Sequence, residues 1–265
     1  HSDYLGDTLE EIAAEKAGIL KPGAPAVVGP LRPGPLDVVL DRAAEAGVPV
    51  DVLGRDMSVA DVSVGLDVTR FTYRSGGWAS GIRVNTPLVG EHQARNAALA
   101  IRALERFDSS VSVQDVAVGM AEVSWPGRFE VLNPQGECWV LDIAHNPAAT
   151  RALAEMVTAL PLPRPVVLLL SILGDKSWSE MLPPLLTAAS ASVFTIAPSS
   201  PAERRWKPLE ALQAAQGWPV EVELNFDRAM RRARELAGRG TVVVTGSAHT
   251  VGDARNLILT RTELE

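Results

Sequence analysis

The sequence predicts an α/β protein in two parts. In residues 129–265, short runs of Val, Leu and Ile alternate with helical segments, which is typical of parallel strands covered on both faces. Residues 1–123 begin with the same strand-and-helix rhythm and continue into a β-hairpin and further helices. Pro126 and Gly127 interrupt the rhythm, and that pair is typical of a linker. We therefore predict domains at 1–123 and 129–265, joined by a linker at 124–128.

In the first part, a helix is predicted over 8–18, because Thr8 and Glu11 can form a capping box and Gly18 can end it. The rhythm of the next segments favours a parallel pair of strands, and the later alternation favours an antiparallel hairpin. The remaining predicted elements are a buried strand at 26–28, a helix at 36–46 ended by Gly47, a strand at 48–53, a hairpin with strands at 62–73 and 82–84, a helix at 91–107 with apolar positions at Ala97, Leu99, Ala100 and Leu104, and a helix from Ser112 to about 123.

The second part predicts a Rossmann-like domain, because strands and helices alternate without interruption. The predicted strands are 138–143, 166–171, 192–197, 220–224 and 241–245, and the predicted helices are 147–160, 177–189, 209–216 and 226–237.

Composition excludes several classes of protein. A net charge of −7 argues against nucleic-acid binding, which requires a basic face. We expect no membrane association, because no apolar run approaches the length of a membrane span and no charged-then-apolar leader opens the sequence. Cys138 is the single cysteine, so an internal disulfide is excluded and a cytoplasmic location is expected.

Candidate site residues in the second part follow predicted strands, where ligands bind in open α/β sheets. Asp142 and His145 follow the first strand, and an aspartate at such a position commonly accepts hydrogen bonds from a ribose. Lys176 follows the second strand in Gly-Asp-Lys, where a cation can hold a carboxylate or a phosphate. After the last strand, Ser247 offers a hydroxyl, and His249 is a weaker candidate. The alternative is that these residues only cap helices or bind local backbone.

Other candidates lie before residue 129. Arg128, in the predicted linker, can supply a cation to a transferring phosphoryl group. Asn96, on the helix at 91–107, can frame a base, although simple helix capping explains the start of that helix equally well. The apolar neighbours of Lys16 would direct its stem toward the core, and a buried lysine can take up carbon dioxide to form a carbamate, an anionic metal ligand. The alternative is an exposed lysine paired with Glu11 or Glu15.

Taken together, these segments resemble the folylpolyglutamate synthase/dihydrofolate synthase family, a branch of the Mur ligase superfamily. The resemblance extends along essentially the whole chain, and its strength comes from the ordered set of motifs. The motifs are His1 with Asp3-Tyr4-Leu5-Gly6-Asp7-Thr8, Glu15-Lys16-Ala17-Gly18-Ile19, His92-Gln93 with Asn96-Ala97, Pro126-Gly127-Arg128, Asp142 with Ala144-His145-Asn146-Pro147, Gly174-Asp175-Lys176, and Thr245-Gly246-Ser247.

The resemblance implies the end of a P-loop-type Mur ligase central domain followed by a Rossmann-like C-terminal Mur ligase domain. It implies an enzyme that uses ATP to phosphorylate a folate or dihydropteroate carboxylate and then joins L-glutamate to the acyl phosphate. A monomer is expected.

The resemblance also implies a role for each matching residue. Asn96 would lie near the adenine, Asp142 at the ribose and Arg128 at the phosphates. His145 and Ser247 would belong to the glutamate side, with Lys176 nearby. Two magnesium ions are implied, one bound by His1 and the other by a carbamylated Lys16; His145, Lys176 and Lys16 would be the catalytic residues.

The chain departs from the family pattern at its start. No Gly-x-x-x-x-Gly-Lys-Ser/Thr loop occurs in the 265 residues, so we expect a chain that lacks the preceding phosphate-binding half and has little ligase activity alone. A peptidoglycan Mur ligase and a non-catalytic binding remnant are the alternatives. A nicotinamide-dependent dehydrogenase is disfavoured, because no Gly-x-Gly-x-x-Gly follows a predicted strand.

Overall fold

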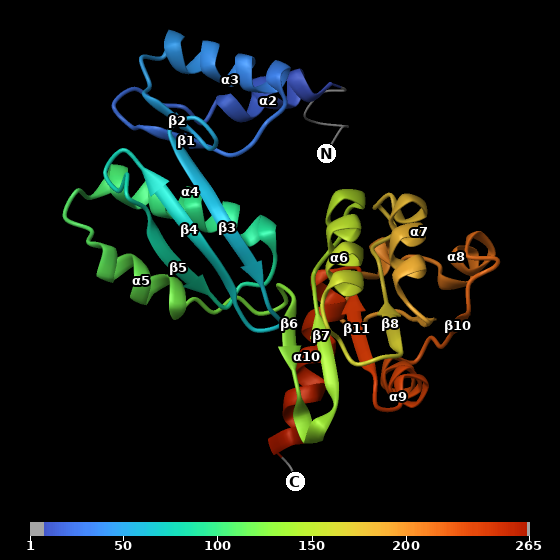
Figure 1. Cartoon of the computed structure of the whole chain (residues 1–265). Helices are drawn as coiled ribbons and strands as arrows, with labels where there is room; N and C mark the ends of the chain where they lie inside the picture. Colours follow the sequence, from blue (N-terminus) through green and yellow to red (C-terminus); the bar gives the residue numbers. More distant parts are fainter. Residues whose placement is uncertain (1–7, 264–265) are drawn as a thin grey trace. The chain divides into compact units, whose positions relative to one another are not determined.

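The computed structural model describes residues 8–263, and the chain divides into two compact units (Figure 1). The N-terminal unit contains the described residues up to Val64 together with Val68–Val123, and the C-terminal unit contains Gly65–Asp67 and the chain from Ser124 onward. No helix within residues 8–263 is both long and apolar enough to cross a membrane.

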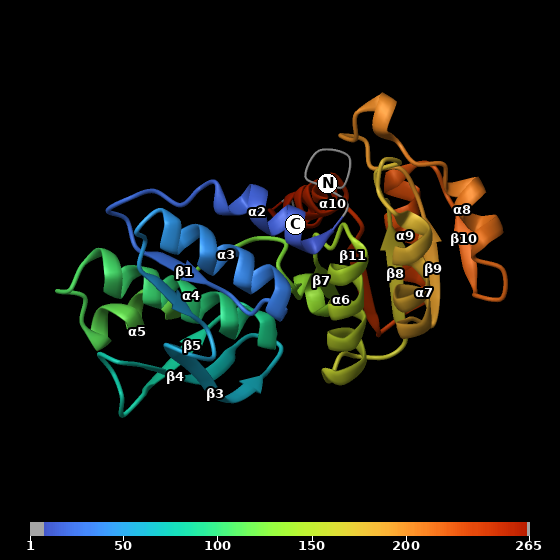
Figure 2. The same cartoon turned by 90° about the horizontal axis from the view of Figure 1, so that it is seen from above.

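The N-terminal unit combines a small parallel sheet with a three-stranded antiparallel sheet. Strands β1 and β2 pair in parallel, as predicted, and helices α2 and α3 pack against each other (Figure 2). Strands β3, β4 and β5 pair antiparallel, and helices α4 and α5 pack on them. The elements are α2 (Leu9–Ala17), β1 (Ala26–Val28), α3 (Pro33–Glu45), β2 (Val50–Val52), β3 (Met57–Val64), β4 (Thr69–Ser75), β5 (Ile82–Thr86), α4 (Glu91–Phe107) and α5 (Val113–Ala121).

Helices α2 and α5 of this unit begin at side-chain caps. Thr8 accepts a hydrogen bond from the Glu11 amide and the Glu11 side chain accepts one in return, which confirms the predicted capping box. Ser112 and Asp115 form a second box at the start of α5.

Three predictions for this unit were wrong in detail. The expected strand at 62–73 is two strands, since the chain turns between β3 and β4. Strand β1 is half-buried rather than buried. On α4 the buried stripe is Ala94, Ala97, Ala98 and Ile101, whereas Ala100 and Leu104 are exposed. The stripe has helical spacing and packs on the alternating Phe71, Tyr73 and Val84 of the sheet, so packing selects which of several apolar positions is buried.

The C-terminal unit is a six-stranded sheet in the order β10-β9-β8-β11-β7-β6. All neighbours are parallel except β6, which pairs antiparallel with β7. The elements are β6 (Glu130–Leu132), β7 (Cys138–Leu141), α6 (Pro147–Ala159), β8 (Val166–Leu170), α7 (Trp178–Ala188), β9 (Ala191–Phe194), α8 (Pro208–Ala214), β10 (Val220–Val222), α9 (Phe226–Ala237), β11 (Thr241–Thr245) and α10 (Ala248–Glu263).

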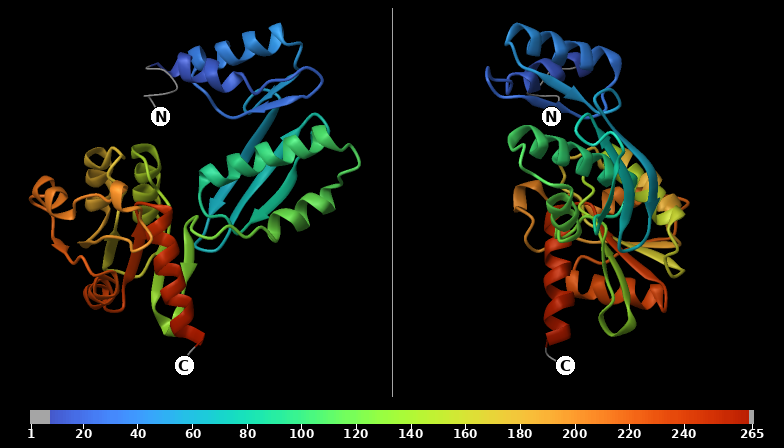
Figure 3. Two further views of the ribbon diagram at one scale, coloured as in Figure 1. Left: turned by 180° about the vertical axis from the view of Figure 1, so that it is seen from behind. Right: turned by 60° about the vertical axis from the view of Figure 1, so that its left-hand side comes forward.

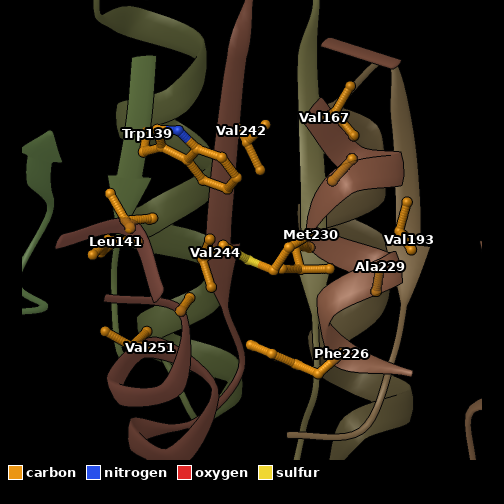
Figure 4. Packing of buried hydrophobic residues seen from close by; sticks show 14 of the residues in the cluster. Trp139, Leu141, Val167, Val193, Phe226, Ala229, Met230, Val242, Val244 and Val251 are labelled. Atoms are coloured by element: carbon orange, nitrogen blue, oxygen red, sulfur yellow. The ribbon is translucent and has the colours of Figure 1, made fainter. Parts of the chain in front are cut away.

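Helices cover both faces of this sheet, as the near-continuous apolar strands predicted. On one face, alternate strand residues pack against α9 and α10 (Figure 4). Members of this cluster include Trp139, Leu141, Val167, Val193, Val242, Val244, Phe226, Met230 and Val251. Helices α6 and α7 pack on each other at the other face (Figure 2).

Two elements of the C-terminal unit were not predicted. Strand β6 begins at Glu130, the last residue of the 127–130 turn, and extends the sheet at its edge. Helix α10 follows β11 and runs along the sheet (Figure 3). The signal for α10 was available in the sequence, because Val251, Ala254 and Ile258 recur at helical spacing and all three are buried.

Candidate functional site

Polar loops gather at the carboxyl edge of the C-terminal sheet. Strands β9, β8, β11 and β7 are parallel neighbours, so the loops that follow them emerge at one edge. The chain leaves β7 and β8 for α6 and α7 on one face, and leaves β11 for α10 on the other. Such a change of direction is where open α/β sheets bind ligands.

Asp142 follows β7 and is half-buried at this edge. Its Oδ2 accepts a hydrogen bond from the Phe129 amide and its Oδ1 accepts one from the Ala144 amide, both at 2.9 Å. Burial raises the pKa of the Asp142 carboxyl to about 6, against the opposing effects of those two amides and of Arg128. The carboxylate therefore binds local backbone, and each oxygen retains a lone pair for a further donor such as a ribose hydroxyl.

Residues 127–130 form a turn that packs on the same edge. The Gly127 carbonyl accepts a hydrogen bond from the Ile143 amide at 2.9 Å, and the Gly127 amide donates to Glu130 Oε2 at 3.0 Å. Gly127 and Phe129 are buried, whereas Arg128 between them is exposed. Within the described residues, the Arg128 guanidinium has no ion-pair or hydrogen-bond partner. The turn therefore presents a cation that is available to an anionic ligand.

His145 lies in the loop after β7, three residues beyond Asp142, and is exposed. Its Nδ1 is 2.9 Å from the Ile143 carbonyl oxygen. That contact leaves Nε2 as the ring nitrogen directed to a ligand. The next residue, Asn146, caps α6 by accepting a hydrogen bond from the Ala149 amide, and Pro147 occupies the first helical position as predicted.

Lys176 lies in the loop after β8, held beside Asp175. Its Nζ is 3.4 Å from Asp175 Oδ2, while Arg204 contacts both oxygens of Asp175 at 3.2 and 2.9 Å. The Arg204 hydrogen bonds are the main reason that the pKa of Asp175 is lowered. Asp175 is thus shared between Arg204 and Lys176, and two cations at one carboxylate leave the loop with an excess of positive charge for an anionic ligand.

The Ser247 hydroxyl occupies a buried position that the sequence did not reveal. Ser247 accepts a hydrogen bond from the Thr250 amide at 3.1 Å, as a helix cap does, and its Oγ lies 2.7 Å from Thr250 Oγ1. Thr250 in turn donates to the Ser171 carbonyl at 2.7 Å. Ser247 is 2% exposed, so its direct contribution here is to fix the start of α10 against the loop after β8.

Two further side chains meet at this edge. His249 Nδ1 is 3.1 Å from Ser199 Oγ, and the Ser199 amide donates to Asp253 at 2.9 Å. These contacts tie the loop after β9 to the first turns of α10, and no sequence motif indicated the Ser199 contact.

The expectation for Lys16 was wrong in its premise. Lys16 is exposed on α2, and the buried residues of this helix are Ala13 and Ala17. Ile19, which belongs to the apolar stripe formed by the neighbours of Lys16, is 81% exposed. The stripe therefore does not carry the lysine stem into a core within residues 8–263.

Asn96 is exposed on α4 of the N-terminal unit, where its amide donates to Gln93 Oε1 at 3.2 Å. His1 lies outside the described residues. No group of three or more His, Cys, Asp or Glu residues suited to a metal ion occurs in residues 8–263. The described residues therefore do not fit a magnesium ion by themselves.

Comparison with known proteins finds relatives that match nearly the whole chain. Residues 127–249 match the family described as Mur ligase, glutamate ligase domain. A folylpolyglutamate synthase from Lacticaseibacillus casei is 30% identical over 265 residues, covering 98% of this chain and 60% of the relative. A dihydrofolate synthase/folylpolyglutamate synthase from Mycobacterium tuberculosis is 31% identical, covering 97% of this chain and 58% of the relative.

Solved structures extend the likeness to the fold. The Mycobacterium tuberculosis folylpolyglutamate synthase complexed with ADP matches with a TM-score of 0.84 and 31% identity, covering 97% of this chain and 61% of that one. The Escherichia coli FolC in complex with DHPP and ADP matches with a TM-score of 0.84 and 27% identity, covering 98% and 59%. The chain thus spans about 60% of the length of these relatives. Along 97–98% of its length the chain is therefore similar to folylpolyglutamate synthases, and its residues 127–249 match the glutamate ligase domain of the Mur ligases.

Proposed function

We propose that the protein is an ATP-dependent ligase that joins L-glutamate to a folate or dihydropteroate carboxylate through an acyl phosphate. The observation that carries the proposal is Arg128, whose guanidinium has no hydrogen-bond or ion-pair partner among residues 8–263 and which the hydrogen bond from Phe129 holds on the same sheet edge as Asp142. A cation and a half-buried carboxylate at this edge suit the phosphates and ribose of a nucleotide. Relatives of known structure bind ADP, which supports this assignment.

In the proposed reaction, ATP phosphorylates the substrate carboxylate, the glutamate amine attacks the acyl phosphate and inorganic phosphate leaves. Arg128 would bind the phosphates and stabilise the charge that develops on the transferring group. Asp142 would accept a ribose hydroxyl, and Asn96 would contact the adenine. His145 and Lys176 would hold the carboxylates of the incoming glutamate, with Ser247 shaping that side by fixing the start of α10.

We propose that the protein acts as a monomer, and the buried, unpaired Cys138 fits a reducing compartment such as the cytoplasm. We infer from the family resemblance that one magnesium ion is bound by His1 and another by a carbamylated Lys16. A carbamate at Lys16 would replace a cation with an anionic oxygen ligand.

Replacing Arg128 with alanine should lower kcat/KM for ATP by about 100-fold or more, because a donor aimed at developing phosphoryl charge is lost. The measurement is phosphate release with ATP, L-glutamate and either dihydropteroate or a reduced folate, using the natural protein at full length. Arg151→Ala is the matched control, since Arg151 is also exposed in the C-terminal unit but lies on α6.

Equal activity in the two variants would contradict the role of Arg128. Absence of phosphate release with every folate substrate, in a folded wild-type protein, would overturn the proposed function. Release with a nucleotide-linked muramyl substrate instead would assign the chain to the cell-wall branch.

Replacing Lys16 with alanine should abolish most turnover, and excess bicarbonate or a small carboxylic acid should restore part of it. A carbon-13 carbamate signal from labelled bicarbonate should be present in the wild type and absent in Lys16→Ala. Lys21→Ala is the control, because Lys21 is a neighbouring exposed lysine whose Nζ donates to the Gly18 carbonyl. A wild-type rate in Lys16→Ala, or no carbamate signal in the wild type, would end the carbamate proposal.

A further inference from the structure

We propose that Arg255 of α10 is a positioning residue for Arg128, acting through Glu130 and the turn at 127–130. The inference rests on the proposed function only for the identity of the ligand that Arg128 binds. The restraint itself is contained in the C-terminal unit and is built from three layers of contact.

The first layer pins the backbone on both sides of Arg128. The Gly127 carbonyl accepts from the Ile143 amide, the Gly127 amide donates to the Glu130 side chain, and the Phe129 amide donates to Asp142. Arg128 itself has no side-chain partner among residues 8–263, so these backbone contacts are what fix the point from which its side chain leaves the turn.

The second layer concerns backbone conformation. Gly127 has φ +75° and Phe129 has φ +50°, so left-handed residues flank Arg128 on both sides. A non-glycine residue such as Phe129 adopts this region only when its surroundings hold it there. A Cβ at position 127 would lie 2.9 Å from Val251 Cγ1, which shows how closely α10 approaches the turn. The turn therefore depends on external contacts for its shape.

The third layer is the ion pair from α10. Arg255 Nε lies 3.0 and 3.1 Å from the two oxygens of Glu130, and Oε2 is the same atom that accepts from the Gly127 amide. Both side chains are partly shielded, with 32% of Arg255 and 18% of Glu130 exposed. Arg255 therefore fixes the carboxylate that fixes Gly127, and a shielded charge-assisted contact is stronger than an exposed one.

Helix α10 anchors this contact to the sheet edge. Val251 and Arg255 are four residues apart and so share the helix face that meets the turn. At its start, α10 is fixed by the Ser247 cap and by Thr250, which donates to the Ser171 carbonyl. The position of Arg128 is thereby coupled to the loops after β8 and β11, where the proposed glutamate-side residues lie.

The test compares Arg255→Gln and Arg255→Lys with Arg232→Gln in this chain. Arg232→Gln is the matched control, because Arg232 contacts both oxygens of Glu221 at 2.7 and 2.8 Å on α9, in the same unit. Amide hydrogen exchange at Gly127 and Phe129 should become about tenfold faster in Arg255→Gln and remain unchanged in Arg232→Gln. Arg255→Lys should restore part of the protection, since it keeps the charge.

A second readout separates positioning from general stability. In the natural protein at full length, the Nε resonance of Arg128 should shift on titration with ADP. The titration midpoint should rise about tenfold in Arg255→Gln, with thermal midpoints equal in the two Gln variants. Unchanged exchange at Gly127 and Phe129 in Arg255→Gln would overturn the inference. The Arg128 resonance of the wild type could remain unchanged on addition of ADP while amide exchange at Gly127 and Phe129 changes as expected. That result would contradict the proposed nucleotide role of Arg128 and support the positioning of the turn by Arg255.

Discussion

Replacing Gly246 with alanine should lower the free energy of unfolding of the C-terminal unit by about 3 kcal/mol or more. Gly246 joins β11 to α10 with φ +107°, a conformation that L-residues rarely adopt. A Cβ at this position would lie 2.6 Å from the Ser171 carbonyl oxygen and 3.0 Å from Ile172 Cγ1. Because the closest atom belongs to the backbone next to β8, it cannot move aside without disturbing the sheet edge.

Gly217→Ala is the control that isolates steric overlap from backbone strain. Gly217 has φ +94° in the same unit, but a Cβ there meets no atom within 4 Å. We expect a loss of about 1 kcal/mol for Gly217→Ala, from strain alone. Urea unfolding followed by tryptophan fluorescence, to which the C-terminal unit contributes the buried Trp139 and Trp206, measures both. Equal losses in the two variants would show that the overlap at Gly246 is relieved at little cost.

Replacing Asp51 with asparagine should destabilise the N-terminal unit by about 3 kcal/mol or more. Asp51 is 4% exposed in the middle of β2 and pairs with two arginines of α4: Arg102 at 3.0 Å and Arg106 at 2.7 Å. Removing the carboxylate leaves two guanidinium groups close together without the anion that both of them contact. Glu105, which also accepts from Tyr73 and Ser75, remains the only acid beside Arg102 among the described residues.

The contacts of Asp51 with the two arginines make the stability of the N-terminal unit fall at acid pH. The hydrogen bond from Arg106 lowers the pKa of Asp51 to about 2, with Arg102 adding to the effect. A lowered carboxyl pKa contributes stability above the unfolded value near 3.9 and loses it as pH falls through about 2. We expect about 2 kcal/mol of wild-type stability to disappear in that window, and Asp51→Asn to lack this part of the acid dependence.

Hydrogen exchange of the α4 amides in increasing denaturant measures this effect within the N-terminal unit. The matched control is Glu45→Gln, because the Arg42–Glu45 pair is also close, at 3.0 Å, but both side chains are more than half exposed. We expect that control to change stability by less than about 0.5 kcal/mol. A similar loss in both variants would show that burial adds nothing to the Asp51 pairs.

Local signals in the sequence determined most of the elements. Helix α4 and helix α9 have the predicted bounds, and β11 does as well, because their hydrophobic periodicity and end signals are strong. The cap at Thr8 and the Asn146-Pro147 start of α6 were readable for the same reason: each depends on residues three or four positions apart. The positions of Asp142, Lys176 and Ser247 after parallel strands also followed from the order of elements alone.

The tertiary structure alone decided what those side chains contact. Ser247 is buried by Thr250 and Ser171, and the latter lies 76 residues earlier in the chain. Lys16 is exposed, although its apolar neighbours indicated the opposite, because burial depends on what packs against a helix and not on its own periodicity. The contact of Arg255 with Glu130 joins residues 125 positions apart, and no local pattern can report a pairing made by the return of α10 along the sheet.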